Sequence, residues 1–263
     1  MYLKKLFGDF FGLINVCGPK VALKWLGQVF FRLPEVLKKK NLQPADRGMG
    51  MGPFQVKYAL AGSSFTVIGE EAFSGIREMY VRDTYLHGGV LTISEEDTVV
   101  DLGANMGNFT NLALAHGAGV NVIAVEPNAN SNSVFEESVG SNPGYLDRVK
   151  LIRAFVGLMA GKQQSLSQDS AYSDAPWLSE DELIQRAGVE KIDFLKCDIE
   201  GGEFDLLTPQ SRLLAMTRLI AVEIHHFAGD VDAFIKMLRS CSFTILNIQR
   251  DPDGTATVLA KRS

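Results

Sequence analysis

The spacing of hydrophobic positions changes near residue 50, and this change divides the chain. In the first 33 residues apolar side chains return every three or four positions on either side of Pro19, which predicts two amphipathic helices. The sequence RGMGMGP at 47–53 then breaks regular structure with glycine and proline. Beyond it, alternating apolar residues at 54–60 and 65–68 flank the turn AGSS and predict a β-hairpin, and residues 70–86 have a helical pattern.

After residue 97 short apolar runs alternate with helix-like segments. Strands are predicted at 98–102, 121–125, 149–155, 192–197 and 219–224, and helices at 109–116, 131–139, 180–187 and 231–239. Apolar strands separated by helices imply a parallel sheet covered on both faces. The last two strands, at 243–248 and 255–260, are joined only by RDPDG, which forces an antiparallel pair. The predicted fold is α/β, a doubly wound, mostly parallel seven-stranded sheet with an antiparallel edge hairpin.

These elements predict an N-terminal helical appendage at 1–50 and a main domain at 51–263, in which a hairpin and cap at 51–97 precede a Rossmann-like core at 98–263. A chain of 263 residues can bury a sizeable core without disulfides or metal. The three cysteines form no CxxC pair, which fits a reducing compartment. No apolar run is long enough to span a bilayer and no signal peptide is evident, so a cytoplasmic location is predicted.

Charge is distributed unevenly between the two parts. Residues 1–45 hold eight Lys or Arg against two acidic residues, a net +6, so with −5 overall the rest of the chain carries −11. An acidic main body argues against nucleic acid as the principal substrate, because binding phosphates needs a basic face. The basic amphipathic segment predicts docking on a partner, on a second copy as a homodimer, or peripherally on an anionic membrane, unless its apolar stripe packs on the main domain.

Unusual polar residues follow the predicted strands, where sheets of this kind bind ligands. In VVDLGANMGNF at 99–109, Asp101 ends a strand, and Gly103 and Gly107 let the backbone approach a ligand before a helix whose first N–H groups favour an anion. Glu126 lies 25 residues after Asp101, where nucleotide-binding units present an acid to ribose hydroxyls. A nucleoside with a small charged tail is therefore predicted. S-adenosylmethionine fits better than NAD, because Asp101 suits a cationic group and the G-x-G-x-x-G pattern is absent.

Four segments, VVDLGANMGNFT, VIAVEPN, IDFLKCDIEGGEFDLL and AVEIHH, resemble in this order the FkbM-type family of S-adenosylmethionine-dependent methyltransferases. The resemblance covers about residues 54–260 and leaves 1–50 outside. It implies the seven-stranded class I methyltransferase fold with an antiparallel last strand. It also implies O-methylation of a hydroxyl on a sugar, glycolipid or secondary metabolite, and therefore a small-molecule or glycan substrate.

The resemblance further implies which residues bind S-adenosylmethionine. The segment IREMYVRDTYLHGGVL at 76–91 resembles the family's helix before the first motif, is expected to help cover the cofactor, and contains the candidate Glu78, whose alternative is a plain surface position. The remaining implied contacts are Asp101, Gly103, Asn105 and Gly107 at the methionine part, Glu126 at the ribose, Asn128 beside the adenosine, and Asp198 and Glu200 next to the transferring methyl.

The sequence EIHH at 223–226 supplies the candidate catalytic residues. Glu223 and His225 share one face of a strand and are expected near Asp198. Histidine accepts protons near neutral pH, so His225 is the predicted general base, with Glu223 or Asp198 orienting it and Asp198 as the second choice of base. A purely structural role for the histidines stays open. A divalent metal is the other alternative, although the spacing is not that of a metal motif and no metal ligand is predicted.

Two other classes of function stay open. One is a non-catalytic member of the fold that binds a nucleoside or serves as a scaffold, and the other is a nicotinamide-dependent oxidoreductase. The methyl acceptor is not encoded in a transferable pattern. The loops expected to select it lie at 157–177 and 54–90.

Overall fold

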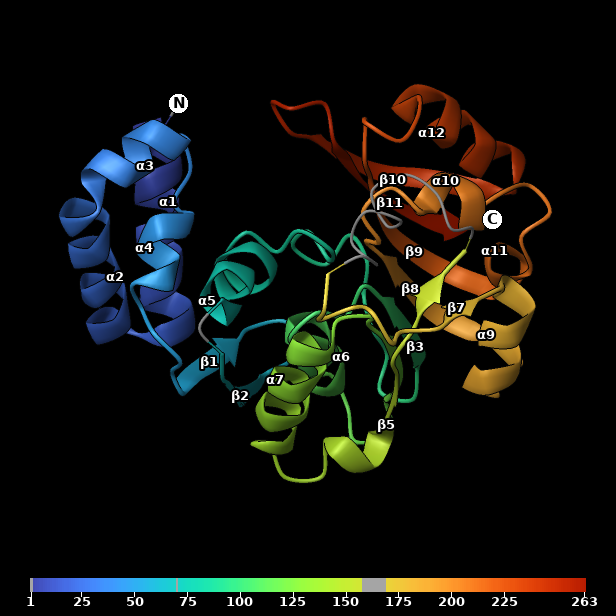
Figure 1. The fold of residues 1–263 in the computed structure, drawn as a ribbon, viewed down its shortest axis with the longest axis horizontal. Helices are drawn as coiled ribbons and strands as arrows, with labels where there is room; N and C mark the ends of the chain where they lie inside the picture. The colour runs from blue at the N-terminus through green and yellow to red at the C-terminus, as the bar shows by residue number, and fades with distance from the viewer. Residues whose placement is uncertain (1, 70, 158–168) are drawn as a thin grey trace.

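The computed structural model describes residues 2–69, 71–157 and 169–263. A seven-stranded sheet forms its centre, with the strand order β10-β11-β9-β8-β3-β4-β5 (Figure 1). The strands are β3 (Thr98–Leu102), β4 (Asn121–Val125), β5 (Val149–Ile152), β8 (Ile192–Cys197), β9 (Thr217–Ile224), β10 (Phe243–Arg250) and β11 (Ala256–Arg262). The strand β11 runs antiparallel to both neighbours, and the other pairings are parallel. The predicted sheet and its antiparallel edge pair are therefore confirmed.

Helices cover both faces of this sheet. They are α6 (Asn108–Leu114), α7 (Ala129–Gly140), the 3₁₀ turn η2 (Leu146–Arg148), α9 (Glu180–Ala187), α10 (Glu203–Leu206), α11 (Arg212–Met216) and α12 (Val231–Ser240). Because side chains alternate across a strand, Phe194 and Leu195 of β8 enter two different hydrophobic clusters, one on each face. The carboxyl ends of the buried parallel strands are thereby left as the exposed edge where loops gather.

The N-terminal segment contains four helices where the sequence predicted two. They are α1 (Tyr2–Cys17), α2 (Pro19–Phe31), α3 (Leu33–Lys39) and α4 (Gln43–Arg47). Proline occupies one of the first two positions of α2, α3 and α4, where its missing N–H costs no hydrogen bond. Pro34 and Pro44 therefore begin new helices where the apolar spacing alone gave no break.

A hairpin and a short helical segment join these helices to the sheet. The hairpin pairs β1 (Phe54–Tyr58) with β2 (Ser63–Val67), and α5 (Ala72–Gly75) continues into the π-helix η1 (Ile76–Val81). The helix predicted to reach residue 86 thus ends at Val81, and residue 70 lies outside the described residues. Trp25, Phe73 and Phe109 belong to one hydrophobic cluster, so the core continues across residue 50. The domain boundary there stays a prediction.

A buried group of charges, here called the junction cluster, links the N-terminal helices to η1. Its members are Asp9, Asp46, Arg77 and Arg82, with Trp25 as a neutral donor. Arg77 donates to Asp46 through Nε (2.7 Å) and Nη2 (2.5 Å) and to Asp9 through Nη1 (2.6 Å). The helices are therefore attached to the rest of the molecule by hydrogen-bonded ion pairs as well as by apolar contact.

The strand predicted at 149–155 is interrupted. β5 ends at Ile152, and β6 (Phe155–Val156) pairs instead with β7 (Trp177–Leu178) in a separate sheet. The rings of Phe155 and Trp177 stack with centroids 4.5 Å apart. Residues 158–168, most of the loop expected to select the acceptor, lie outside the described residues. Among the helices that are described, none has the length and apolarity needed to cross a membrane.

Candidate active site

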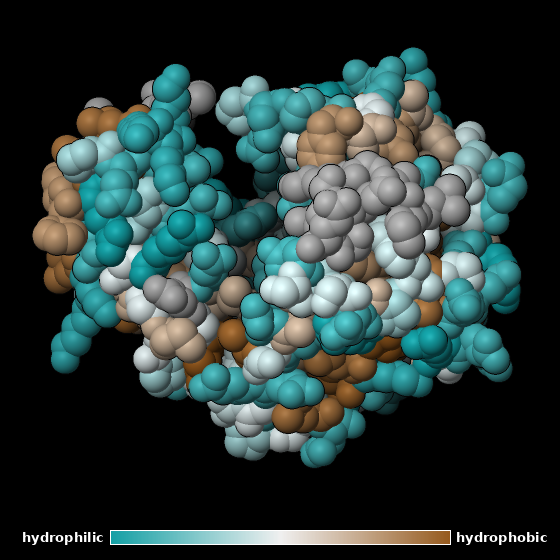
Figure 2. All heavy atoms as spheres, in the orientation of Figure 1, coloured by the Kyte–Doolittle hydropathy of each residue, from teal (hydrophilic) through white to brown (hydrophobic). Residues whose placement is uncertain are grey.

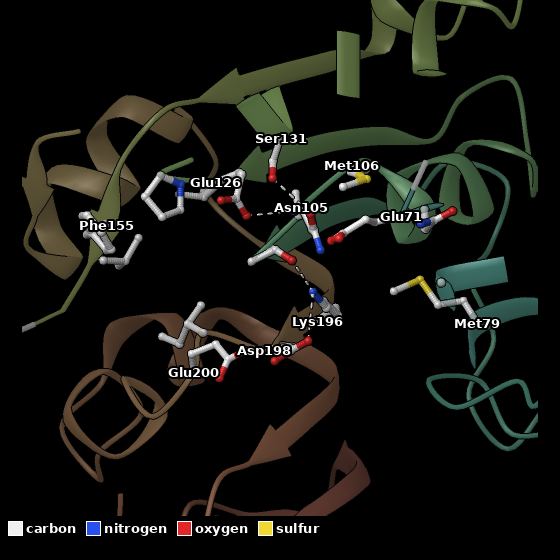
Figure 3. A pocket seen from close by; sticks show the side chains of 18 of the residues that line it. Glu71, Met79, Asn105, Met106, Glu126, Ser131, Phe155, Lys196, Asp198 and Glu200 are labelled. Atoms are coloured by element: carbon white, nitrogen blue, oxygen red, sulfur yellow. Dashed lines mark hydrogen bonds and ion pairs between the residues drawn. The ribbon is translucent and has the colours of Figure 1, made fainter. Parts of the chain in front are cut away.

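A cavity of about 240 Å³ opens where β3, β4 and β8 end (Figure 3). Loops after these strands and the helical segment α5–η1 form its walls. Of the predicted cofactor-binding residues, the structure brings six together as lining residues: Glu78, Gly103, Asn105, Glu126, Asp198 and Glu200. Three others, Asp101, Gly107 and Asn128, do not line it. The predicted binding edge of the sheet is therefore hollowed, but not every predicted side chain faces the hollow.

Glu126 is fixed at the end of β4 by backbone hydrogen bonds. Its Oε2 accepts the N–H of Asn105 at 2.9 Å and its Oε1 the N–H of Asn128 at 2.8 Å. Burial raises the pKa of Glu126 despite these two donors, which act in the opposite direction. The side chain of Asn128 is engaged elsewhere, because its Oδ1 accepts the N–H groups of Asn130 and Ser131 and caps α7. Its predicted place beside the adenosine stays a prediction.

The two glycines of the first loop have different surroundings. Gly103 has φ +75°, and a Cβ there would lie 1.8 Å from the carbonyl oxygen of Asp198. Only glycine therefore lets the loops after β3 and β8 approach this closely. Gly107, with φ +79°, precedes α6 and faces Phe135 of α7, 2.9 Å from where a Cβ would be. Gly103 thus shapes the cavity wall, whereas Gly107 permits helix packing behind it.

Asp101 lies behind the cavity and has a buried cation as its partner. Its Oδ2 accepts the hydroxyl of Thr110 at 2.8 Å, and its Oδ1 is 3.3 Å from Nζ of Lys196. Burial alone would lower the pKa of Lys196, but the charges of Asp101 and Asp198 outweigh it and raise that pKa. Lys196 lines the cavity and donates to the carbonyl of Gly103 at 2.6 Å. The sequence analysis missed it, although a lone lysine in the apolar run IDFLKC was a usable signal.

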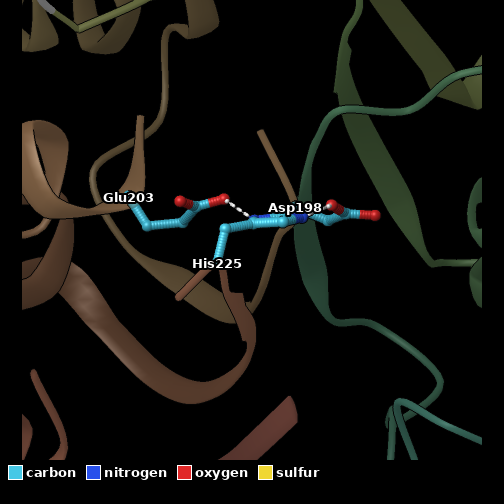
Figure 4. Close-up of side chains that lie close together, drawn as sticks. All are labelled: Asp198, Glu203 and His225. Atoms are coloured by element: carbon cyan, nitrogen blue, oxygen red, sulfur yellow. Dashed lines mark hydrogen bonds and ion pairs between the residues drawn. The ribbon is translucent and has the colours of Figure 1, made fainter. Parts of the chain in front are cut away.

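Beside the cavity lies a second group of side chains, here called the acid–histidine cluster: Asp198, Glu200, Glu203, Glu223 and His225. Glu203 of α10 is fully buried, and its Oε1 is 2.9 Å from Nδ1 of His225 (Figure 4). The same oxygen accepts the N–H groups of Ile199 at 3.1 Å and Gly201 at 3.2 Å. Glu203 had no assigned role in the sequence analysis, yet it holds the imidazole in place.

The other ring nitrogen of His225 faces three acids without a hydrogen bond to any. Its Nε2 lies 3.8 Å from a carboxylate oxygen of each of Asp198, Glu200 and Glu223. Since Asp198 and Glu200 also line the cavity, this nitrogen faces two residues of the cavity wall. The structure thus brings the predicted catalytic residues His225, Asp198 and Glu223 together.

Excess negative charge controls protonation in this cluster. Burial would lower the pKa of His225, but the hydrogen bond to Glu203 and the nearby carboxylates raise it to about 9. Burial, together with the charges of Asp198 and Glu78, also raises the pKa of Glu223. The hydroxyl of Tyr85 donates to Asp198 at 3.2 Å and is 3.4 Å from Glu223. The cluster therefore retains protons at neutral pH that such groups would lose in water.

The same residues offer ligands for a metal ion. One ligand atom each from Asp198, Glu203 and His225 lies within 4.8 Å of the others. Carboxylate and imidazole are ordinary ligands of divalent cations. Because Glu203 already engages Nδ1 of His225, the nitrogen left for a metal is Nε2, which has Asp198 rather than Glu203 as a neighbouring carboxylate. A divalent cation is thus the alternative to a proton at this nitrogen.

Strand order and cavity position together define a class of protein. A mostly parallel seven-stranded sheet with one antiparallel strand beside its edge, and a cavity at the carboxyl ends of the central strands, is the architecture of class I methyltransferases. Residues 101–245, more than half of the chain, match the family model of the methyltransferase FkbM domain. The chain therefore belongs to the FkbM methyltransferase family, and S-adenosylmethionine is its methyl donor. This match favours methyl transfer over the nicotinamide-dependent alternative.

The individual proteins to which this chain is similar share less than a quarter of their aligned residues with it. The hexuronic acid methyltransferase AglP of Haloferax volcanii is 23% identical over 199 residues, which cover 72% of this chain and 82% of AglP. The precorrin-6y C5,15-methyltransferase of Geobacter metallireducens GS-15 has a TM-score of 0.45 and 11% identity, covering 70% of this chain and 88% of that one. Fibrillarin of Aeropyrum pernix, with natively bound S-adenosylmethionine, has a TM-score of 0.44 and 15% identity, covering 65% and 68%. With TM-scores below 0.5, neither structure bears on the activity.

The cavity residues fit S-adenosylmethionine by their chemistry. The carboxylates of Glu78, Glu126 and Asp198 accept hydrogen bonds and therefore suit ribose hydroxyls and an ammonium group. Val125 and Phe155 add apolar wall that suits a purine. Which residue holds which part of the cofactor stays a prediction.

Proposed function

We propose that the protein is an O-methyltransferase acting on a hydroxyl group of a sugar, glycolipid or secondary metabolite. The observation that carries this proposal is His225, whose Nδ1 is held by the buried Glu203 while Nε2 faces the cavity-lining Asp198 and Glu200. A hydroxyl acceptor must lose its proton during transfer, and a positioned histidine is suited to accept it. Similarity to a hexuronic acid methyltransferase supports a sugar as the acceptor.

The charge of the acid–histidine cluster favours a neutral acceptor. A hexuronic acid has both hydroxyl groups and a carboxylate, and only the hydroxyls require a base for methylation. The carboxylates of Asp198 and Glu200 lie 3.8 Å from Nε2 of His225 and would repel a carboxylate placed there. The proposed reacting group is therefore a hydroxyl, whether or not the substrate also has a carboxylate elsewhere.

In the proposed mechanism the protein aligns the acceptor oxygen with the methyl group and accepts the hydroxyl proton. S-adenosylmethionine supplies an electrophilic methyl group on a sulfonium, and holding the acceptor oxygen in line with it provides most of the rate acceleration. His225 Nε2 takes the hydroxyl proton. Glu203 keeps Nδ1 protonated and stabilises the imidazolium that results. Because the pKa of His225 is raised to about 9, only a fraction of the enzyme has the neutral imidazole at pH 7, so the rate should increase with pH.

The substrate class is tested by mass spectrometry of methylated products. The enzyme and S-adenosylmethionine are incubated with neutral sugars, with hexuronic acids, and with the same acids reduced at the carboxyl. We expect one methyl group on an ether oxygen in at least one neutral or reduced sugar. Transfer only to free carboxylates, giving methyl esters, would contradict the hydroxyl proposal. Calorimetric binding of S-adenosylmethionine without turnover on any acceptor would favour the non-catalytic alternative.

The base is tested with His225 variants and a matched control. His225→Ala should lower kcat for an identified acceptor about a hundredfold or more and leave S-adenosylmethionine affinity nearly unchanged. His226, whose Nδ1 is 3.4 Å from Thr255 Oγ1, is the control, and His226→Ala should change kcat less than about threefold.

Glu203→Gln should move the rising limb of the pH profile to lower pH, because it removes the charge that raises the pKa of His225. Activity lost with EDTA and restored by Mg²⁺ would instead assign these residues to a metal.

We also propose the cytoplasm as the location. None of the three cysteines, all within the described residues, forms a disulfide. This is the usual state of thiols in a reducing compartment.

A further inference from the structure

The N-terminal helices have large apolar side chains on their outer side as well as on their inner side. Half of the fourteen exposed large hydrophobic residues found in the described part of the chain come from α1, α2 and α3. Figure 2 shows hydrophobic side chains along the outer margin of this bundle, over α2. These residues, here called the N-terminal apolar surface, are Phe7, Phe11, Leu23, Phe30, Phe31, Leu33 and Leu37.

The inner faces of these helices are already packed. On α2, Trp25 and Val29 lie one turn apart and are buried against the molecule. Phe30 and Phe31 at the end of the same helix are 66% and 80% exposed. The inner apolar side chains of these helices therefore pack against the rest of the protein. Further apolar side chains on the outer side are exposed to solvent instead. Exposed apolar surface gathered in this way marks an interaction site.

Positive charge accompanies the apolar residues on the same helices. Lys5, Lys20, Lys38 and Lys39 are exposed. Of the two acids in residues 1–45, Asp9 is buried in the junction cluster, which leaves Glu35 as the exposed one. The burial of Asp9 under two arginines thus removes an acid from the surface and leaves the outer side of the bundle basic. The remaining chain carries −11, so the charge of the molecule is strongly polarised.

We propose that the outer side of α1–α3 docks the protein on an anionic lipid bilayer. In this arrangement the exposed phenylalanines and leucines enter the interface between head groups and acyl chains, and the lysines contact the anionic head groups. The acidic body is repelled by the same lipids and therefore stays on the aqueous side. A second copy of the chain fits less well, because pairing two +6 segments brings like charges together and lysine is depleted in such interfaces.

Vesicle binding tests this proposal directly. The full-length protein is mixed with vesicles of phosphatidylcholine alone or of phosphatidylcholine with phosphatidylglycerol, and the bound fraction is measured by flotation. We expect binding to the anionic vesicles that weakens as salt is added. Binding to both lipids alike, or to neither, would overturn the proposal.

Two sets of variants separate the apolar from the electrostatic contribution. The double variant Phe30→Ser with Phe31→Ser and the double variant Lys38→Glu with Lys39→Glu should each weaken binding at least about tenfold. The matched control is Leu146→Ser with Leu246→Ser, which removes two exposed leucines elsewhere and should bind like wild type. Circular dichroism and S-adenosylmethionine affinity should be unchanged in all three. A dimer in light scattering that the phenylalanine variant dissociates, without vesicle binding by the wild type, would assign the surface to self-association and overturn the lipid proposal.

Discussion

The junction cluster and the acid–histidine cluster both place carboxylates around cationic side chains, but the hydrogen bonds of these carboxylates differ. In the junction cluster all four carboxylate oxygens of Asp9 and Asp46 accept hydrogen bonds, which come from Arg77, Arg82 and Trp25. In the acid–histidine cluster one nitrogen of His225 is held at 2.9 Å, and the other has three oxygens at 3.8 Å. The first arrangement is closed, whereas the second has room for another atom.

This difference separates a structural use of buried charge from a chemical one. A guanidinium matches two carboxylates geometrically and stays charged at any ordinary pH, so its burial is compensated and permanent. An imidazole surrounded by more acids than it can bond retains a proton that a substrate or metal can displace. The two clusters are therefore expected to respond differently to substitution, to ligand and to pH.

The largest expected effect is on the junction cluster. Arg77→Ala leaves Asp9 and Asp46 buried without their shared cation, and breaking such a buried pair from one side costs about 3–5 kcal/mol of unfolding free energy. Urea denaturation followed by circular dichroism measures this loss. The exposed pair of Arg212 and Asp181 is the control, and Arg212→Ala should cost less than about 1 kcal/mol. Equal losses for the two arginines would mean that the junction cluster is not a closed structural unit.

Much of the sheet could be predicted because its central strands are buried and mostly apolar. The predicted bounds 98–102, 121–125 and 192–197 coincide with those of β3, β4 and β8. Helices α10 and α11, with four and five residues, are too short to show a helical period, so neither was predicted. The interruption after Ile152 also had no local signal, because it depends on β6 pairing with β7 some twenty residues later.

The site was predictable in its position more than in its contacts. Loops after parallel strands must meet at one edge, which is why Glu126, Asp198 and His225 were expected together. Whether a side chain faces the ligand or the core depends on neighbours from distant segments. Glu203 became a partner of His225 only because α10 packs against the end of β9, and Asp101 turned inward because Lys196 neutralises it. Neither relation can be read from spacing along the chain.

Glu126 shares features with both clusters, and its substitution is the second test of the comparison. Two backbone N–H groups bond it, as in a structural site, yet it lines the cavity, as in a functional one. We expect Glu126→Ala to weaken S-adenosylmethionine binding by about 1.5–3 kcal/mol, because charge-assisted hydrogen bonds to ribose hydroxyls are lost. Calorimetry measures the affinity, and circular dichroism checks the fold. Lower stability with unchanged affinity would place Glu126 with the structural carboxylates and contradict the cofactor assignment.

The smallest expected effect, taken per pH unit, concerns pH, and it distinguishes the clusters without a ligand. The pKa of His225 is raised in the fold from 6.5 to about 9, so the folded protein binds more protons than the unfolded chain between these values. The stability contributed by the proton on His225 is therefore fully present below pH 6.5 and is lost as pH rises through 9. The raised pKa of Glu223 acts in the same direction, since that carboxyl also retains its proton only in the fold. Arg77 does not titrate in this range.

We therefore expect the unfolding free energy to fall by about 1 kcal/mol for each pH unit between about pH 6.5 and pH 8.5, measured by urea denaturation. Replacing both titrating groups, with His225→Asn and Glu223→Gln, should flatten this dependence. Arg77→Ala should lower stability by the same amount at both pH values, because the junction cluster exchanges no proton there. A pH dependence that persists in the double variant would show that the protons lost on unfolding are bound outside the acid–histidine cluster. The proposed difference between the junction cluster and the acid–histidine cluster would then be wrong.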